Sequence, residues 1–166
     1  MQVSIMILSC CYQEYRPIRV VSRAAIRRTG TILSGTAQYA LRAVVHLAGS
    51  GAKGPVTALQ LAQAADVPAN YMGKILHELA RSGVLKSARG KRGGFELAVS
   101  PHELPLLAVV APFDHMGEDR RCLLGRPQCS DSDPCATHER WGEVSRKIHD
   151  FFRTTTVADV LKTGAT

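Results

Sequence analysis

The chain has no run of apolar residues long enough to cross a membrane. Nothing in its 166 residues approaches the ~20 consecutive apolar positions of a transmembrane helix. The apolar stretch at residues 3–11 is short, with no basic segment before it and no small-residue cleavage site after it, so we expect no signal peptide. Internal repeats and low-complexity tracts are also lacking. With 45% hydrophobic and 21% charged residues, the composition indicates a globular chain without a membrane partner.

The usual arrangements of catalytic residues are lacking as well. No nucleophile lies near a base, and no two carboxylates are spaced for acid and base chemistry, so we expect neither an enzyme nor a small-molecule substrate. The glycine-rich segment at residues 90–94 matches neither of the common phosphate-binding patterns, Gly-x-x-x-x-Gly-Lys-Ser/Thr and Gly-x-Gly-x-x-Gly. A nucleotide-binding loop is therefore not predicted.

The five cysteines do not resemble a secreted disulfide framework. Cys10 and Cys11 are adjacent, while Cys122, Cys129 and Cys135 lie together near the other end of the chain. This odd number and spacing favour a reducing, cytoplasmic location, with the later three as metal ligands or redox thiols.

Positive charge is concentrated in the first two thirds of the chain. The net charge of +7 divides into +4 over residues 1–30, +5 over residues 31–97 and −2 over residues 98–166. Residues 1–30 show no clear periodicity, and we interpret them as a poorly ordered basic extension or as the product of an upstream start-codon assignment. The excess of positive charge over residues 31–97 is what contact with DNA phosphates requires.

Hydrophobic periodicity predicts a mainly α-helical chain with one small β-hairpin. Helices are expected at residues 36–49, 57–65 and 69–82, then strands at residues 84–89 and 95–99 around a turn at 90–94. A fourth helix is expected at residues 104–113, with Pro105 in its first turn. After a loop at residues 114–137, a long helix begins near His138, and one more helical turn is expected at residues 157–161.

Two short helices followed by a hairpin is the order of a winged helix-turn-helix. The helix at residues 69–82 would be the recognition helix, because its apolar residues Met72, Ile75, Leu76 and Leu79 lie on one face and polar residues on the other. Lysine and asparagine suit contacts to base edges and phosphates in the major groove. We predict DNA contacts from Thr57, Asn70, Tyr71, Lys74, His77, Arg89, Lys91, Arg92, Gly93 and Gly94.

The turn of the hairpin is the more specific signal. Arg89, Lys91 and Arg92 alternate with three glycines, which let the backbone turn sharply and enter a narrow groove. A solvated turn needs only one or two glycines, so we interpret the hairpin as a DNA-binding wing.

The three later cysteines could hold a metal centre. Their intervals of six and five residues leave room for an iron–sulfur cluster, whereas zinc sites usually contain Cys-x2-Cys, which is missing here. His138 is the nearest candidate for a fourth ligand, although it could instead cap the last helix or lie on the surface. A disulfide switch without metal and a zinc-stabilised module remain alternatives.

The sequence resembles the IscR/NsrR family, the Rrf-type winged-helix regulators of bacteria. The matching segments are YALRAVVHLA (39–48), VPANYMGKIL (67–76), LARSGVLKSARGKRGGFEL (79–97) and PCATHERW (134–141). The resemblance covers residues 31–161. It implies a winged helix-turn-helix domain at residues 31–101, followed at residues 102–166 by a cysteine loop and a dimerisation helix.

Several properties follow only from this resemblance. It implies a homodimer that binds a double-stranded DNA operator and acts as a repressor. A 2Fe–2S or 4Fe–4S cluster would control this binding. The cluster would sense nitric oxide, redox state or iron–sulfur supply. Cys122, Cys129 and Cys135 would be ligands, and His138 occupies the position of the histidine ligand in the IscR branch. The dimer would form along Trp141, Val144, Ile148 and Phe151, whose spacing of three and four residues suits helix pairing.

Overall fold

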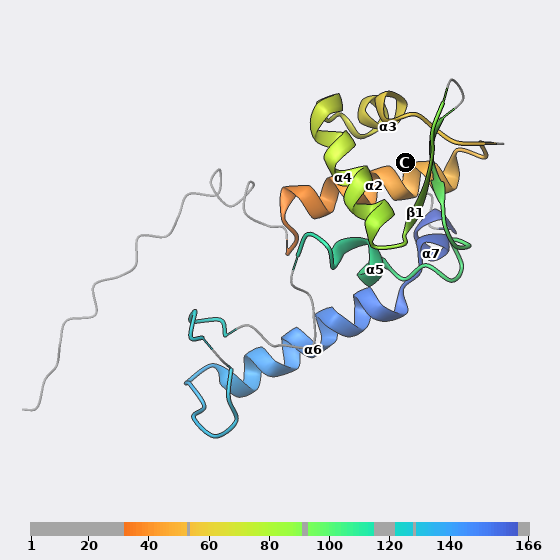
Figure 1. The fold of residues 1–166 in the computed structure, drawn as a ribbon. Helices are drawn as coiled ribbons and strands as arrows, with labels where there is room; N and C mark the ends of the chain where they lie inside the picture. Colours follow the sequence, from red (N-terminus) through yellow and green to blue (C-terminus); the bar gives the residue numbers. More distant parts are fainter. Residues whose placement is uncertain (1–31, 53, 91–92, 115–121, 128, 163–166) are drawn as a thin grey trace, which may run out of the picture. The chain divides into compact units, whose positions relative to one another are not determined.

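A computed structural model describes residues 32–52, 54–90, 93–114, 122–127 and 129–162. The expected basic extension at residues 1–30 lies outside them. The order of elements is α2 (Gly35–Gly49), α3 (Ala58–Ala65), α4 (Ala69–Arg81), β1 (Leu85–Ala88), β2 (Gly94–Leu97), α5 (Leu106–Val110), α6 (His138–Thr154) and α7 (Val157–Lys162) (Figure 1). The prediction of a mainly helical chain with a two-stranded hairpin is confirmed.

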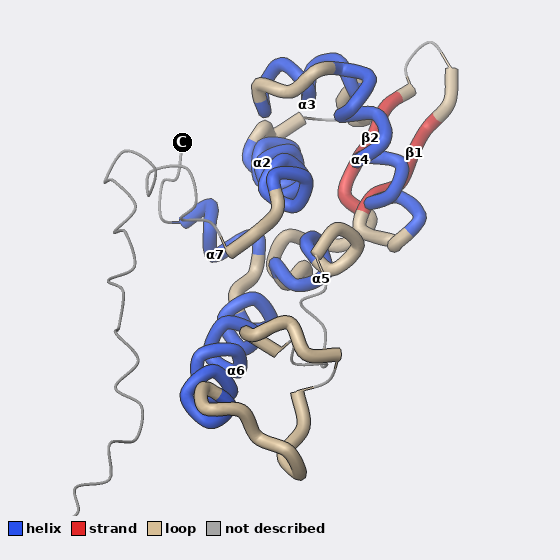
Figure 2. The backbone as a smooth tube through the Cα atoms, turned by 90° about the vertical axis from the view of Figure 1, so that its left-hand side faces the viewer, coloured by secondary structure: helices blue, strands red, loops and turns tan. Residues whose placement is uncertain are grey.

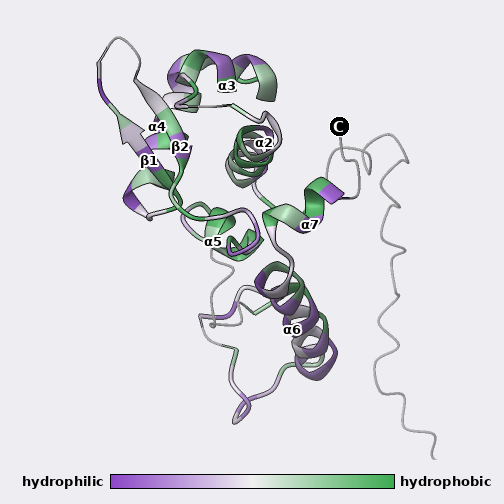
Figure 3. Ribbon diagram, turned by 90° about the vertical axis from the view of Figure 1, so that its right-hand side faces the viewer, coloured by the Kyte–Doolittle hydropathy of each residue, from purple (hydrophilic) through white to green (hydrophobic). Residues whose placement is uncertain are grey.

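Helix α2 is the centre of the hydrophobic core. It packs against α3, α4, α5 and α7, which surround it when it is viewed nearly end-on (Figure 2). Its inward face is made of small and apolar residues, and Figure 3, which views the molecule from the opposite side to Figure 2, shows hydrophobic residues on both α2 and α5. Ser34 caps the helix, because its side chain accepts a hydrogen bond from the Ala37 N–H. The buried residues are Ala37, Ala40, Ala43, Val44 and Leu47.

Helices α3 and α4 form the expected helix-turn-helix. The Thr57 hydroxyl accepts from the Gln60 N–H while the Gln60 side chain accepts from the Thr57 N–H, which together form a capping box. The turn between the helices is made at Asp66, whose φ of 54° is left-handed. Helix α4 ends at Arg81, and Gly83, two residues on, is also left-handed; the Val84 N–H closes the helix end by donating to the Leu79 carbonyl.

The hairpin is antiparallel and is joined by a short third segment. Leu85 pairs with Leu97 and Ala88 with Gly94. On the other edge of β2, Val56 and Phe95 exchange two backbone hydrogen bonds of 2.9 and 2.8 Å. This bridge ties the wing to the start of the helix-turn-helix. Both strands are shorter than predicted, since β2 ends at Leu97 and not at Val99.

The fourth helix differs from the prediction. It spans only Leu106–Val110, and Pro105 is its extended N-cap residue (φ −70°, ψ 148°) rather than part of its first turn. Pro105 forms an isolated antiparallel bridge with Thr156, and the Leu106 N–H donates to the Thr155 carbonyl. The extended backbone needed for this pairing delays the helix, which local sequence periodicity does not reveal.

The same pairing anchors the C-terminal end of α6. The Val157 N–H donates to the Leu104 carbonyl, and Phe152 near the end of α6 is buried in the core. Helix α7 then packs against α2. The first part of α6 carries the cysteine loop at its N-terminal end (Figure 1). No helix within the described ranges is long and apolar enough to cross a membrane.

Candidate DNA-binding face and cysteine loop

Helix α4 divides into a buried face and a polar face, as its sequence predicts. Met72, Ile75, Leu76 and Leu79 are its buried residues. Asn70, Lys74, His77 and Arg81 are exposed, and Gly73 among them is half-buried. Arg81 pairs with Glu78 on the helix surface at 3.2 Å. The polar face therefore leaves Asn70 and Lys74 available to a groove of DNA.

Tyr71 lies at the edge of this face and is fixed by helix α2. Its hydroxyl shares a hydrogen bond of 2.5 Å with the Thr36 hydroxyl. Its ring meets the ring of Tyr39 edge to face, with centroids 6.1 Å apart, and the Arg42 guanidinium lies 6.0 Å from the Tyr39 ring. Tyr71 remains 37% exposed, so one side chain contacts both the core helix and the solvent-facing surface.

His77 joins the recognition helix to the wing. Its ring meets the ring of Phe95 on β2 edge to face at 5.7 Å. Phe95 is buried, whereas His77 is exposed. The histidine predicted to face DNA therefore also supports the packing of the wing on α4.

The wing glycines have a reason within the protein itself. A Cβ at Gly94 would lie 2.5 Å from the Val56 carbonyl oxygen, and one at Gly93 would lie 2.4 Å from the Ala88 carbonyl oxygen. Gly90 has a φ of 103°, which side chains rarely adopt. Gly93 is therefore needed for close backbone approach within the hairpin, and Gly94 for close approach of β2 to the segment at Val56, whereas the sequence alone indicated only an approach to a DNA groove.

The remaining predicted DNA contacts lie around the wing and the start of α3. Arg89 on the wing is exposed, and Thr57 is exposed while capping α3. Lys91 and Arg92 at the turn lie outside the described residues. The polar face of α4 together with Thr57 and Arg89 is called the candidate DNA face below.

The cysteine loop, residues 122–137, brings His138 against one of the three thiols. The Cys129 Sγ lies 3.4 Å from His138 Nδ1, and the other ring nitrogen, Nε2, lies 2.6 Å from Asp131 Oδ1. His138 is only 9% exposed, so it is not a surface histidine. Its first ring nitrogen faces a thiol and its second is held by a carboxylate.

The other two cysteines are neighbours. The Cys135 Sγ lies 3.4 Å from the Thr137 hydroxyl. Hydrogen bonding from that hydroxyl and from the Thr137 backbone lowers the pKa of the Cys135 thiol, with a smaller lowering from a hydrogen bond with Cys122 and from the positive charge of Arg126. Arg126 is itself held by an ion pair of 3.0 Å with Asp133. All three cysteines are free thiols and half-buried.

These donors lie in two pairs, Cys122 with Cys135 and Cys129 with His138. Within the described part of the chain, no group of three histidine, cysteine or acidic side chains is gathered closely enough to hold a single metal ion. The donor chemistry nevertheless fits a cluster, because thiolates and imidazole are the ligands of iron–sulfur centres.

Asp131 and Thr137 were not predicted as functional residues. Both lie in the cysteine loop within three residues of a cysteine, and a carboxylate or hydroxyl so placed commonly supports a ligand. The loop has no periodicity, however, and Asp133 would have been an equal candidate by spacing. Only the folded loop distinguishes the carboxylate that reaches His138 from the one that reaches Arg126.

Helix α6 leaves apolar side chains exposed. Val144 is 47% and Phe151 is 54% exposed, while Trp141 and Ile148 are half-buried. Ile148 packs partly against the core of its own chain. The predicted dimer seam is therefore present on the surface, but not all of it is free for a partner.

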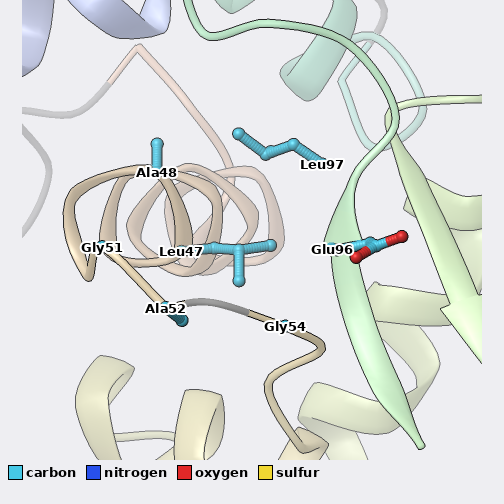
Figure 4. A pocket seen from close by; sticks show the side chains of 7 residues that line it. All are labelled: Leu47, Ala48, Gly51, Ala52, Gly54, Glu96 and Leu97. Atoms are coloured by element: carbon cyan, nitrogen blue, oxygen red, sulfur yellow. The ribbon is translucent and has the colours of Figure 1, made fainter.

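A shallow hollow lies between the end of α2 and strand β2. Its volume is about 190 Å³, and Figure 4 shows the side chains that line it, Leu47 and Leu97 among them. Among the described lining residues, Glu96 alone is charged, and its side chain points away from the hollow (Figure 4).

Comparison with known proteins agrees with this architecture. Residues 33–163 match the model of the Rrf2 family, described as an iron-dependent transcriptional regulator. An HTH-type transcriptional regulator of Aquifex aeolicus is 34% identical over 132 residues, covering 78% of this chain and 91% of its own. IscR of Vibrio campbellii is 25% identical over 130 residues, covering 78% of this chain and 77% of its own.

Solved structures show the same fold. IscR of T. potens has a TM-score of 0.65 at 24% identity, covering 82% of this chain and 90% of its own. CymR of B. subtilis, described as the global cysteine regulator, has a TM-score of 0.68 at 20% identity, covering 80% of this chain and 98% of its own. These relatives are regulators and not enzymes. The chain belongs to the Rrf2 family and is a winged-helix, DNA-binding transcriptional regulator.

Proposed function

We propose that this protein is a cytoplasmic repressor whose operator binding is controlled by an iron–sulfur cluster in the cysteine loop. The observation that carries the proposal is the gathering of three thiols and the buried His138 into two pairs beside the start of α6. The description of the family model as iron-dependent supports it. The signal would be nitric oxide, redox state or iron–sulfur supply.

The DNA-binding domain, residues 31–101, would contact the operator through the candidate DNA face. Asn70 and Lys74 would read base edges or phosphates in the major groove, while the wing residues Arg89, Lys91 and Arg92 contact the adjacent backbone or minor groove. Residues 102–166 would form the regulatory part. Exposed apolar side chains on α6 support a homodimer, whose two recognition helices would read half-sites about one helical turn, ~34 Å, apart.

Four residues would hold the cluster. Cys122, Cys129 and Cys135 would bind through sulfur, and His138 would bind through Nδ1, the nitrogen that faces Cys129. Asp131 accepts a hydrogen bond from Nε2 and so keeps the lone pair on Nδ1, as carboxylates behind metal-bound histidines commonly do. When bound, such a cluster supplies reactivity toward nitric oxide and oxidants.

The control of DNA binding would act through the connection between loop and dimer helix. The cysteine loop ends at the first residue of α6, so its conformation sets where that helix begins. A change in the dimer helices would alter the spacing of the two recognition helices. Several phosphate contacts would then be lost together, and with them much of the affinity.

The proposal is tested by purifying the full chain without oxygen. A brown protein with visible absorption, and with iron and sulfide bound, is expected. Substitution of Cys129 by serine should remove the colour while the far-ultraviolet circular dichroism stays unchanged. A colourless protein that contains zinc would contradict the iron–sulfur proposal and indicate a zinc-stabilised module.

A metal-free thiol switch is the second candidate, because Cys122 and Cys135 are hydrogen-bonded neighbours. An oxidant such as a peroxide would take two electrons from the two thiols, which would lose two protons and join in one disulfide. A colourless, metal-free protein in which peroxide links Cys122 to Cys135 would favour this function. Mass spectrometry of peptides released without reductant measures the link.

A further inference from the structure

The first turn of α2 is joined to two distant parts of the chain by side-chain hydrogen bonds. The Ser34 N–H donates to Asp114 Oδ2 at 2.8 Å, across 80 positions of sequence. Two residues further on, the Thr36 hydroxyl is bonded to the Tyr71 hydroxyl at 2.5 Å, across 35 positions. The two bonds are two residues apart on α2, so whatever fixes Ser34 also fixes Thr36.

Asp114 supplies a charge that α2 lacks. The helix has no acidic residue in its first turn, although carboxylates are favourable beside the positive end of a helix. Ser34 uses its side chain to cap the helix, and Asp114 accepts the N–H of the same residue. A carboxylate from another segment therefore completes the start of α2.

The position of Asp114 connects it to the regulatory part of the chain. Its own N–H donates to the Val110 carbonyl at the end of α5. Helix α5 packs against both α2 and α6. Asp114 thus comes just after α5 in the chain, and α5 packs against α6, the proposed dimer helix.

Two residues of α2, Thr36 and Tyr39, both contact Tyr71 on α4. The Thr36 hydroxyl bonds its hydroxyl, and Tyr39 supports its ring. Tyr71 lies in the first turn of α4 and is 37% exposed. Its hydroxyl can therefore be held by α2 while its ring edge is presented to DNA.

We propose that Asp114 is a positioning residue for DNA binding: it fixes the first turn of α2, and this turn holds Tyr71 in the orientation that meets the operator. The inference rests on the proposed DNA contact of Tyr71. The hydrogen bonds at Ser34 and Thr36 would connect α5 to the recognition helix α4. This route does not depend on which cofactor the cysteine loop holds.

A double-mutant cycle on the full-length protein tests this route. The probe is a DNA duplex that the wild-type protein selects from a random-sequence pool. Asp114→Ala and Tyr71→Phe are each expected to weaken binding by about five- to tenfold, the effect of one lost hydrogen bond. The double variant should bind no more weakly than Tyr71→Phe alone, because both changes break one route.

The route would be overturned if the losses of duplex affinity in the two single variants multiplied in the double variant. It would also be overturned if Asp114→Ala bound the duplex as tightly as the wild type. Glu103→Ala removes one negative charge from an exposed position and should bind like the wild type. Where Asp114→Ala unfolds, Asp114→Asn keeps an acceptor oxygen and should bind more tightly than Asp114→Gly at equal folded fraction; equal binding would contradict the route. If the wild type and Glu103→Ala select no duplex, the proposed DNA contacts fail together with the route.

Discussion

At the scale of single residues, Asp159 and Thr156 cap the start of α7 reciprocally. The Thr156 N–H and hydroxyl donate to the Asp159 carboxylate at 3.1 and 2.7 Å, and the Asp159 N–H donates back to the hydroxyl. These bonds, with Lys162 nearby, lower the pKa of Asp159 from 3.8 to about 2. The ionised carboxylate therefore stabilises the folded chain.

This gives a prediction for the pH dependence of stability. Because the folded pKa lies below the unfolded one, the contribution is complete above about pH 4 and is lost as the pH falls toward 2. Asp159→Asn should lower the melting temperature near neutral pH, and the gap to wild type should narrow between about pH 4 and 2. Calorimetry measures the gap. Asp150→Asn, which removes a surface ion pair with Arg153, should change little; a gap independent of pH would contradict the prediction.

Thr137 gives a second prediction at this scale. Its hydroxyl is the largest cause of the lowered Cys135 pKa, so more of the thiol is ionised near neutral pH. In cluster-free protein, Thr137→Val should move the midpoint of Cys135 alkylation to higher pH, while Thr137→Ser should leave it near the wild-type position. Peptide mass spectrometry after iodoacetamide follows the rate, and identical midpoints for Val and Ser would refute the role of the hydroxyl.

At the scale of elements, Gly94 shows why the wing contains adjacent glycines. Gly94→Ala would place a methyl group 2.5 Å from the Val56 carbonyl oxygen and force apart the bridge between Val56 and Phe95. The free energy of unfolding should fall by about 1–3 kcal/mol, as overpacking usually costs. Urea unfolding monitored by circular dichroism measures the loss.

Gly73 is the matched control. A methyl group there would meet nothing within 4 Å, and Gly73 lies inside α4. Gly73→Ala should therefore raise the unfolding free energy by up to about 1 kcal/mol through helix propensity. Equal effects at Gly73 and Gly94 would contradict the packing account.

Local patterns predict the elements well where local forces decide them. The buried stripe of α4 was expected from helical spacing, and the structure confirms it. The capping box at Thr57 and the left-handed Gly83 likewise depend only on neighbours within a few residues. Pro105 was misplaced because its conformation is set by pairing with Thr156, some fifty positions away. Residues whose backbone bonds a distant segment cannot be placed by periodicity.

The candidate site divides in the same way. The exposed face of α4 follows from helical spacing, so Asn70 and Lys74 could be predicted from the sequence as surface residues. The burial of His138 against Cys129, and its bond to Asp131, follow only from the folding of the cysteine loop. The partnership of Asp114 with Ser34 joins segments with no shared pattern.

At the scale of the whole molecule, the exposed apolar residues of α6 predict a dimer. Phe151→Glu would place a charge at a side chain that is 54% exposed and, in the proposed dimer, buried. Sedimentation velocity should show a monomer, and affinity for the selected duplex should fall because one half-site is lost. Arg146→Glu, exposed on α6 away from the seam, should remain dimeric. A dimeric Phe151→Glu would place the interface elsewhere.

Control of DNA binding by the cluster is the central claim. Its most direct test is the affinity of the wild-type protein for its selected duplex, measured without oxygen at one salt concentration, before and after removal of the cluster by a chelator. The account predicts a change of about 5- to 150-fold, the usual range of coupling between two sites. Equal affinity of the intact and cluster-free protein would contradict it.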